Sequence, residues 1–75
     1  MIRKMKVNEL LTLRKGSKIT IMSESGEFSE FRTVDRVWNN PLMFRLTRDK
    51  AVFDERGCEI NPGRDPMWIV IHDQV

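Results

Sequence analysis

This chain of 75 residues has few of the residues that small domains use for cross-linking or catalysis. It contains one cysteine, Cys58, one histidine, His72, and no tyrosine. A single cysteine excludes an intrachain disulfide, and without a Cys/His cluster we expect no bound metal. Because a small domain without disulfides suits a reducing compartment, we expect a cytoplasmic protein.

Long apolar runs are also missing. The late apolar stretch, residues 67–71, has the length of a strand, whereas a membrane helix needs about 20 apolar residues. The N-terminal residues lack the apolar segment of a secretory signal. Apolar residues make up 40% of the chain and charged residues 32%, as in globular domains. We therefore expect one soluble domain over residues 1–75, with no membrane partner.

The residues with catalytic potential are scattered rather than grouped. His72 ends an apolar segment, and its neighbour Asp73 would point to the opposite face of a strand. Cys58 lies close in sequence to Asp54 and Glu59, and nearby carboxylates raise a thiol pKa. The sequence also has no glycine-rich phosphate loop. We expect no enzyme, no cofactor and no small-molecule substrate.

Turn residues divide the chain into short pieces and predict a mainly β fold. Turn signals occur at 25–26, 39–41, 56–57 and 61–63. Asn8 is expected to cap a short N-terminal helix that ends near Gly16 and packs its leucines on the sheet. About five antiparallel strands are expected, from extended segments at 18–23, 27–38, 42–47, 51–54, 58–60 and 67–72.

The segment 27–38 is longer than a typical strand and loses its alternating pattern. Val34 and Val37, for example, are three residues apart. This irregularity predicts a bent strand with a bulge near 29–30 or 35–36. The aromatic residues Phe28, Phe31, Phe44, Phe53 and Trp68 are expected in the core, with Trp38 partly exposed. The predicted core also contains Ile19, Ile21, Val34, Val37, Leu46, Ile69 and Ile71.

Residues 26–60 carry one distinctive pattern of turn and core positions. It comprises Gly26-x-Phe28, the segment 33–37 (Thr-Val-Asp-Arg-Val), Phe44-x-Leu46, and the segment 52–57 (Val-Phe-Asp-Glu-Arg-Gly). The pattern resembles the small SH3-like β-barrel proteins of bacteriophage and plasmid genomes. The resemblance implies an SH3-like barrel and a mobile-element origin. It implies no particular activity, because this barrel hosts many functions.

Positive charge is concentrated near the N-terminus. Residues 1–18 hold six Lys and Arg against Glu9 alone, a net charge of +5 within a chain of net charge +2. Residues 1–7 are expected as a flexible basic arm that meets phosphate, although a solvated tail would explain the same charges.

A basic stripe with a tryptophan predicts nucleic-acid binding. Arg32 and Arg36 share a strand parity with Trp38, and Arg45 takes the outward parity of the next strand. Small barrels bind single-stranded DNA or RNA with cations on phosphate and aromatics under bases. The predicted binding residues are Arg3, Lys4, Lys6, Arg14, Lys15, Lys18, Arg32, Arg36, Trp38 and Arg45.

A protein partner is the alternative. Glu30 and Asp35 lie within the basic segment, and the chain contains five methionines, which adapt to irregular contacts. A mobile-element protein could bind and inhibit a host protein without chemistry of its own. Arg32, Arg36 and Trp38 would then be interface hot spots.

Overall fold

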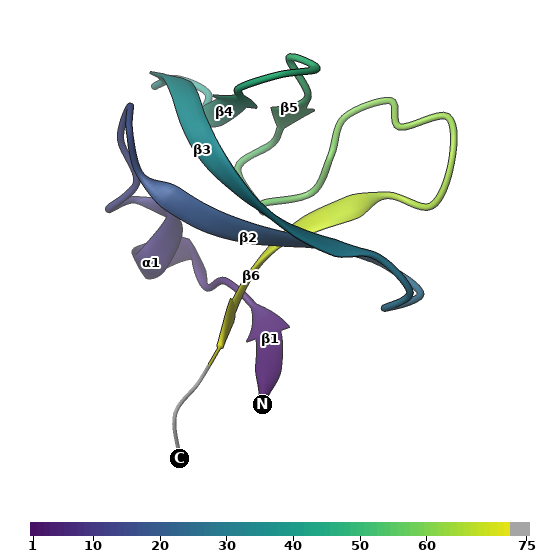
Figure 1. Cartoon of the computed structure of the whole chain (residues 1–75). Helices are drawn as coiled ribbons and strands as arrows, with labels where there is room; N and C mark the ends of the chain where they lie inside the picture. The colour runs from purple at the N-terminus through teal and green to yellow at the C-terminus, as the bar shows by residue number, and fades with distance from the viewer. Residues whose placement is uncertain (73–75) are drawn as a thin grey trace.

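A computed structural model describes residues 1–72 and shows a mainly β fold with one short helix (Figure 1). Its six strands form one antiparallel sheet in the order β1-β6-β2-β3-β4-β5. None of the described residues belongs to a helix long and apolar enough to cross a membrane. The elements are β1 (Ile2–Lys4), α1 (Val7–Leu10), β2 (Lys18–Ser23), β3 (Ser29–Trp38), β4 (Met43–Leu46), β5 (Val52–Phe53) and β6 (Met67–His72).

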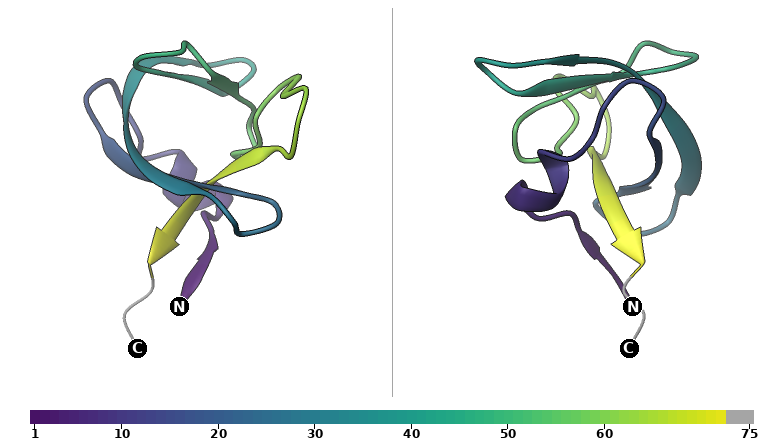
Figure 2. Two further views of the ribbon diagram at one scale, coloured as in Figure 1. Left: turned by 45° about the vertical axis from the view of Figure 1, so that its right-hand side comes forward. Right: turned by 90° about the vertical axis from the view of Figure 1, so that its left-hand side faces the viewer.

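The long strand β3 curls the sheet, because its two halves pair with different neighbours (Figure 2). Its first half pairs with β2, from Met22 opposite Ser29 to Lys18 opposite Thr33. Its second half pairs with β4, and the register shifts between Val34 and Arg36. This shift confirms the predicted bulge at 35–36. An extra residue in one strand increases its local bend, so one strand can serve both parts of the sheet.

Residues 57–60 lie between β5 and β6 and bond to both. Phe53 bridges to Glu59, and Cys58 bridges to Trp68. The Ile69 N–H donates to the Gly57 carbonyl at 2.8 Å. The strand expected at 58–60 is therefore present only as two isolated bridges. The named strands do not close into a ring, since the strand order begins at β1 and ends at β5.

The core lies inside the curl of the sheet. Alternating residues of β2 and β4 face it, which explains why Ile19, Ile21, Phe44 and Leu46 are buried. Two of the predicted core residues, Val37 and Ile71, are only half-buried, and Val37 packs against the core. The buried core cluster consists of Leu10, Ile19, Ile21, Val34, Phe44, Leu46, Phe53, Met67 and Ile69.

The helix α1 is shorter than expected and begins earlier. The Lys6 N–H donates to the Glu9 carboxylate at 2.8 Å, and the Lys6 carbonyl accepts from the Leu10 N–H. Lys6 is therefore the N-cap, and Asn8 lies inside the helix. Gly16 does not end the helix either. Its φ of +94° turns the chain into β2 instead.

The predicted flexible arm at residues 1–7 is wrong. Residues 2–4 form β1, which pairs with β6 in the register Ile2 opposite His72 and Lys4 opposite Val70. The Met5 N–H then donates to the Ile69 carbonyl at 3.0 Å. The N-terminal cations are thus fixed on the sheet.

The prediction that all five aromatics lie in the core is correct for Phe44 and Phe53 and wrong for Phe28 and Phe31. Phe28 is 69% exposed and Phe31 81% exposed. Phe31 pairs with Thr20, on the parity of β2 that faces away from buried Ile19 and Ile21. Trp68 is half-buried, and its ring lies 3.7 Å below Lys4 Nζ.

Candidate nucleic-acid interface

The second half of β3 presents a tryptophan between arginines on the outside of the sheet. Beyond the bulge, Val37 packs toward the core, so Arg36 and Trp38 share the opposite face. Arg45 of β4 lies directly opposite Arg36 in the register. Trp38 is half-buried and Arg36 is exposed. The bulge and the β3–β4 pairing therefore bring together three of the predicted site residues.

Both arginines lie over the indole ring of Trp38. The guanidinium carbon of Arg36 is 4.7 Å from the ring centroid, and that of Arg45 is 6.0 Å from it. At such distances the negative face of the indole attracts a cation. The result is a half-buried aromatic ring with two guanidinium groups over it.

Asp35 balances part of this positive charge. Its carboxylate lies 2.8 Å from Arg45 Nη2 and 3.7 Å from Lys50 Nζ. The hydrogen bond from Arg45, with the charges of Arg45, Lys50 and Lys15, holds the Asp35 pKa below its usual value. Arg36 and Arg45 are like charges placed opposite each other, an arrangement that is unfavourable without such a counterion.

We call Lys15, Asp35, Arg36, Trp38, Arg45 and Lys50 the Trp38 cluster. Its four cations against one carboxylate give a net charge of +3. The part of the chain that the structure describes contains no carboxylate paired with Arg36 or Lys15. Asp35 and Lys50 were not among the predicted site residues. Lys50 follows the turn after β4, and that turn is the signal that could have placed it near β3.

A groove of about 390 Å³ adjoins the cluster at the end of β3. The backbone of Gly16 donates to the Val34 carbonyl at 2.8 Å, which fixes the loop before β2 against β3. This contact brings the predicted residues Arg14 and Lys15 to the groove. Its lining consists of Leu11, Thr12, Leu13, Arg14, Lys15, Val37, Asn39 and Leu42.

The prediction that Arg32 belongs to an exposed stripe is wrong. Arg32 is buried, and its Nη2 donates to Asp49 Oδ1 at 2.7 Å and to the Thr47 carbonyl. Its Nη1 is 3.4 Å from Glu30 Oε1. The bulge explains the error, because counting alternate residues through it assigns Arg32 and Arg36 to one face. In the structure they lie on opposite faces.

The remaining predicted cations lie apart from the Trp38 ring. Arg3 makes two contacts with the Glu9 carboxylate, at 2.7 and 2.8 Å. Lys4 covers Trp68 and lies 3.5 Å from Glu24. Lys6 is exposed at the start of α1, and Lys18 donates to Thr33 at 3.4 Å. Arg3 and Lys4 therefore already have partners within β1, α1 and the β2–β3 hairpin.

The residues with catalytic potential remain separate in the structure. Within residues 1–72, no group of three or more His, Cys, Asp or Glu side chains could hold a metal ion. Burial, and secondly the Asp54 carboxylate, raise the pKa of the Cys58 thiol. His72 is exposed at the end of β6, and Asp73 lies outside the described residues. A less acidic thiol is a weaker nucleophile at neutral pH.

Comparison with protein families, with curated proteins and with solved structures finds no match to this chain. What the chain binds is therefore inferred from its own geometry and charge. The resemblance of residues 26–60 to small barrels of mobile elements stays a prediction.

Proposed function

We propose that this chain is a non-catalytic module that binds single-stranded DNA or RNA through the Trp38 cluster. The observation that carries the proposal is the Trp38 ring with Arg36 and Arg45 above it, in a cluster of net charge +3. Unpaired bases stack on aromatic rings and on guanidinium planes. The surrounding lysines and arginines attract the phosphates between the bases.

The adjoining groove supports a binding path longer than one base. Leu13, Val37 and Leu42 give it apolar walls, and Arg14 and Lys15 lie at the same groove. A base in the groove would place its phosphate near these two cations, and Lys15 belongs to the Trp38 cluster as well. Duplex DNA keeps its bases stacked inside, so it cannot use either position.

We also propose that the fold is an SH3-like barrel. Two observations support this proposal. β3 bends at its bulge and serves two halves of the sheet, and residues 57–60 bond to both β5 and β6. A small barrel of this kind commonly binds through one outer face, without a cavity for a substrate.

Fluorescence anisotropy with labelled dT12, rU12 and a 12-base-pair duplex tests the nucleic-acid proposal. The single strands should bind more tightly than the duplex. Trp38→Ala should weaken binding about 5- to 150-fold, since a stacked base contributes about 1–3 kcal/mol. A double substitution, Lys15→Ala with Arg36→Ala, should reduce the salt slope by about 0.7 for each lost phosphate contact.

Arg56→Ala is the matched control, because it removes one exposed arginine that pairs with Asp54 in its own turn. It should leave the affinity and the salt slope nearly unchanged. Circular dichroism should show that each variant keeps the β fold. If no oligonucleotide binds below about 100 µM at low salt, weaker than ordinary non-specific binding, the proposal fails. A protein partner that the chain binds and inhibits would then replace it.

A further inference from the structure

The first half of β3 has a free edge. Residues 29–33 pair with β2 on one side, but pairing with β4 on the other side begins only at Val34. Residues of an antiparallel strand direct their N–H and C=O groups alternately to one neighbour and to the other. The Thr33 carbonyl accepts from the Thr47 N–H, on the side of β4. By alternation, Ser29 and Phe31 direct their backbone groups to that same side, where none of the strands within residues 1–72 pairs with them.

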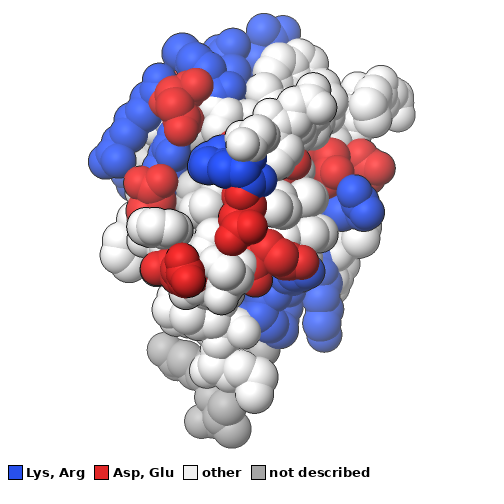
Figure 3. All heavy atoms as spheres, turned by 90° about the vertical axis from the view of Figure 1, so that its right-hand side faces the viewer, with Lys and Arg blue, Asp and Glu red and all other residues white. Residues whose placement is uncertain are grey.

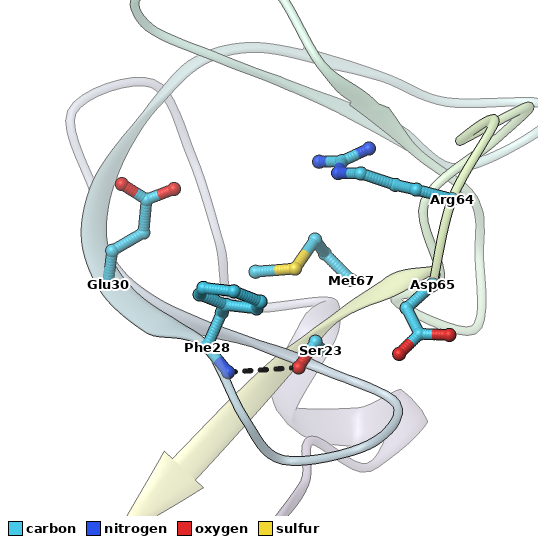
Figure 4. Close-up of a pocket in the computed structure, with 6 residues that line it drawn as sticks. All are labelled: Ser23, Phe28, Glu30, Arg64, Asp65 and Met67. Carbon is cyan, nitrogen blue, oxygen red and sulfur yellow. Dashed lines mark hydrogen bonds between the residues drawn. The ribbon is translucent and has the colours of Figure 1, made fainter.

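A groove of about 490 Å³ lies beside this free edge, between the β2–β3 hairpin and the loop 61–66 (Figure 4). Phe28 and Met67 lie at its centre and form an apolar floor. Glu30 and Asp65 lie on opposite sides of them. The volume is within the range of about 300–1,000 Å³ that is usual for ligand sites. A side chain projecting from an added strand would enter it.

Two carboxylates, Glu30 and Asp65, and one guanidinium, Arg64, line the groove. Asp65 forms no ion pair among residues 1–72, whereas Arg64 is already 3.3 Å from Glu59 and donates to the Pro62 carbonyl at 3.0 Å. Acidic groups lie near the middle of the face that carries the hairpin and the loop, with a basic group among them (Figure 3). A partner with a lysine or arginine two residues from an apolar residue would complement Asp65.

We propose that this edge and groove bind an extended segment of a partner protein, which adds to the sheet beside Ser29–Phe31. An apolar side chain of the segment packs on Phe28 and Met67, and a basic side chain two residues away pairs with Asp65. The residue between them points to the other face and lies against the exposed ring of Phe31. Backbone hydrogen bonds provide affinity in such strand addition, and the side-chain pockets provide specificity.

The same features argue against a nucleic-acid strand as the occupant, because the Glu30 and Asp65 carboxylates that line the groove would repel its phosphates. This inference is independent of the nucleic-acid proposal, because none of its residues belongs to the Trp38 cluster.

A phage library of random dodecapeptides tests the proposal, followed by anisotropy with the selected peptides made synthetically. The selected peptides should alternate apolar residues and carry at least one Lys or Arg. Methylation of the amides that face β3 should weaken binding at least tenfold. Methylation of the alternate amides should have little effect, since those amides point away from the sheet.

Variants of the protein locate the site. Ser29→Pro removes an outward N–H at a strand edge, where proline is tolerated, and should weaken peptide binding at least tenfold. Asp65→Asn should weaken it about fivefold. Glu55→Gln, which removes an exposed carboxylate without an ion pair, is the matched control and should bind like the original chain. Asp65→Asn keeps the test informative if Ser29→Pro does not fold.

Several outcomes would overturn the inference. One is that no peptide is enriched, and another is that the enriched peptides bind both variants as well as the original chain. If the chain dimerises and Ser29→Pro abolishes the dimer, the edge binds a second copy of the chain instead. Displacement of the peptide by dT12 would show one shared surface. Unchanged peptide binding by Trp38→Ala would support two separate sites.

Discussion

Arg32 and Asp49 form an ion pair that joins the first half of β3 to the turn between β4 and β5. Arg32 Nη2 lies 2.7 Å from Asp49 Oδ1. The side chain of Arg32 is 3% exposed, whereas that of Asp49 is 57% exposed. The pair also includes the Thr47 carbonyl as an acceptor for Arg32. A buried guanidinium has left water, so these acceptors replace its hydration and hold the turn in place.

We expect Asp49→Asn to destabilise the protein by about 1–3 kcal/mol, the usual cost of leaving a buried polar group without a good partner. Arg32 would keep the Thr47 carbonyl, the more distant Glu30 and at best a neutral amide oxygen, so its buried charge would lose its nearest counterion. The hydrogen bond from Arg32 holds the Asp49 pKa below its usual value, so this contribution exists above that usual value and is lost as the pH falls. Urea unfolding measures the cost, with Glu55→Gln as the control. An equal midpoint for both variants would contradict it.

Acid should loosen the contact between β1 and α1 when the pH falls toward 2. The hydrogen bonds from Arg3 and from the Lys6 N–H lower the Glu9 pKa to about 2, from an ordinary value of 4.5. Because the folded pKa is lowered, Glu9 contributes stability above pH 4.5, and this contribution disappears as the pH falls toward 2. NMR titration of the Glu9 carboxyl carbon should show the low pKa. Glu9→Gln should flatten the pH dependence of stability in that window, and an ordinary Glu9 pKa would contradict the prediction.

Gly57→Ala should cost more than Gly63→Ala. Both glycines have positive φ, +81° and +66°, which costs another residue about 1–2 kcal/mol. The φ of Gly57 lies further than that of Gly63 from the value of about +57° that other residues adopt in the left-handed region. A Cβ on Gly57 would make only ordinary van der Waals contact, 3.4 Å from a Leu10 methyl, so space does not set the difference. Urea unfolding of the two variants measures the difference. Equal losses would contradict this dependence on φ.

The regular parts of the fold could be predicted from local patterns of apolar residues. Residues 18–23 became β2 with the expected bounds because Ile19 and Ile21 alternate with less buried residues, and residues 67–72 became β6 because they contain an apolar run of strand length. The bulge at 35–36 was predicted from Val34 and Val37, both directed to the core although three residues apart. Local sequence therefore contained the strand positions and the main irregularity.

The faces of β3 could not be predicted with the same success. A bulge adds one residue and reverses the parity that follows it, so Arg36 is exposed although Arg32 is buried. Phe28 and Phe31 were assigned to the core because of their hydrophobicity. Phe31 instead points to the outer face with Thr20, and Phe28 lies in the β2–β3 hairpin beside a groove. Which face of a strand is covered depends on the topology, and no residue near them in sequence reports it.

The prediction of a flexible arm from the N-terminal charges was wrong for a related reason. Arg3, Lys4 and Lys6 look like a solvated basic segment, but β1 pairs with β6, about seventy residues away in the chain. Only Ile2 and Met5 hint at an apolar contact. Pairing between such distant segments depends on where the sheet has an open edge, and the sequence of the first residues does not contain that information.

The register of β1 and β6 also determines how the molecule would respond to a pulling force. Ile2 lies opposite His72, at the same end of the two strands. A force applied between these two residues would load the cross-strand hydrogen bonds one after another, as in opening a zipper. Strands pulled from opposite ends share the load among all their bonds and resist more strongly. Stretched between residues 2 and 72, this domain should therefore yield at low force, with β1 leaving first and the core still intact.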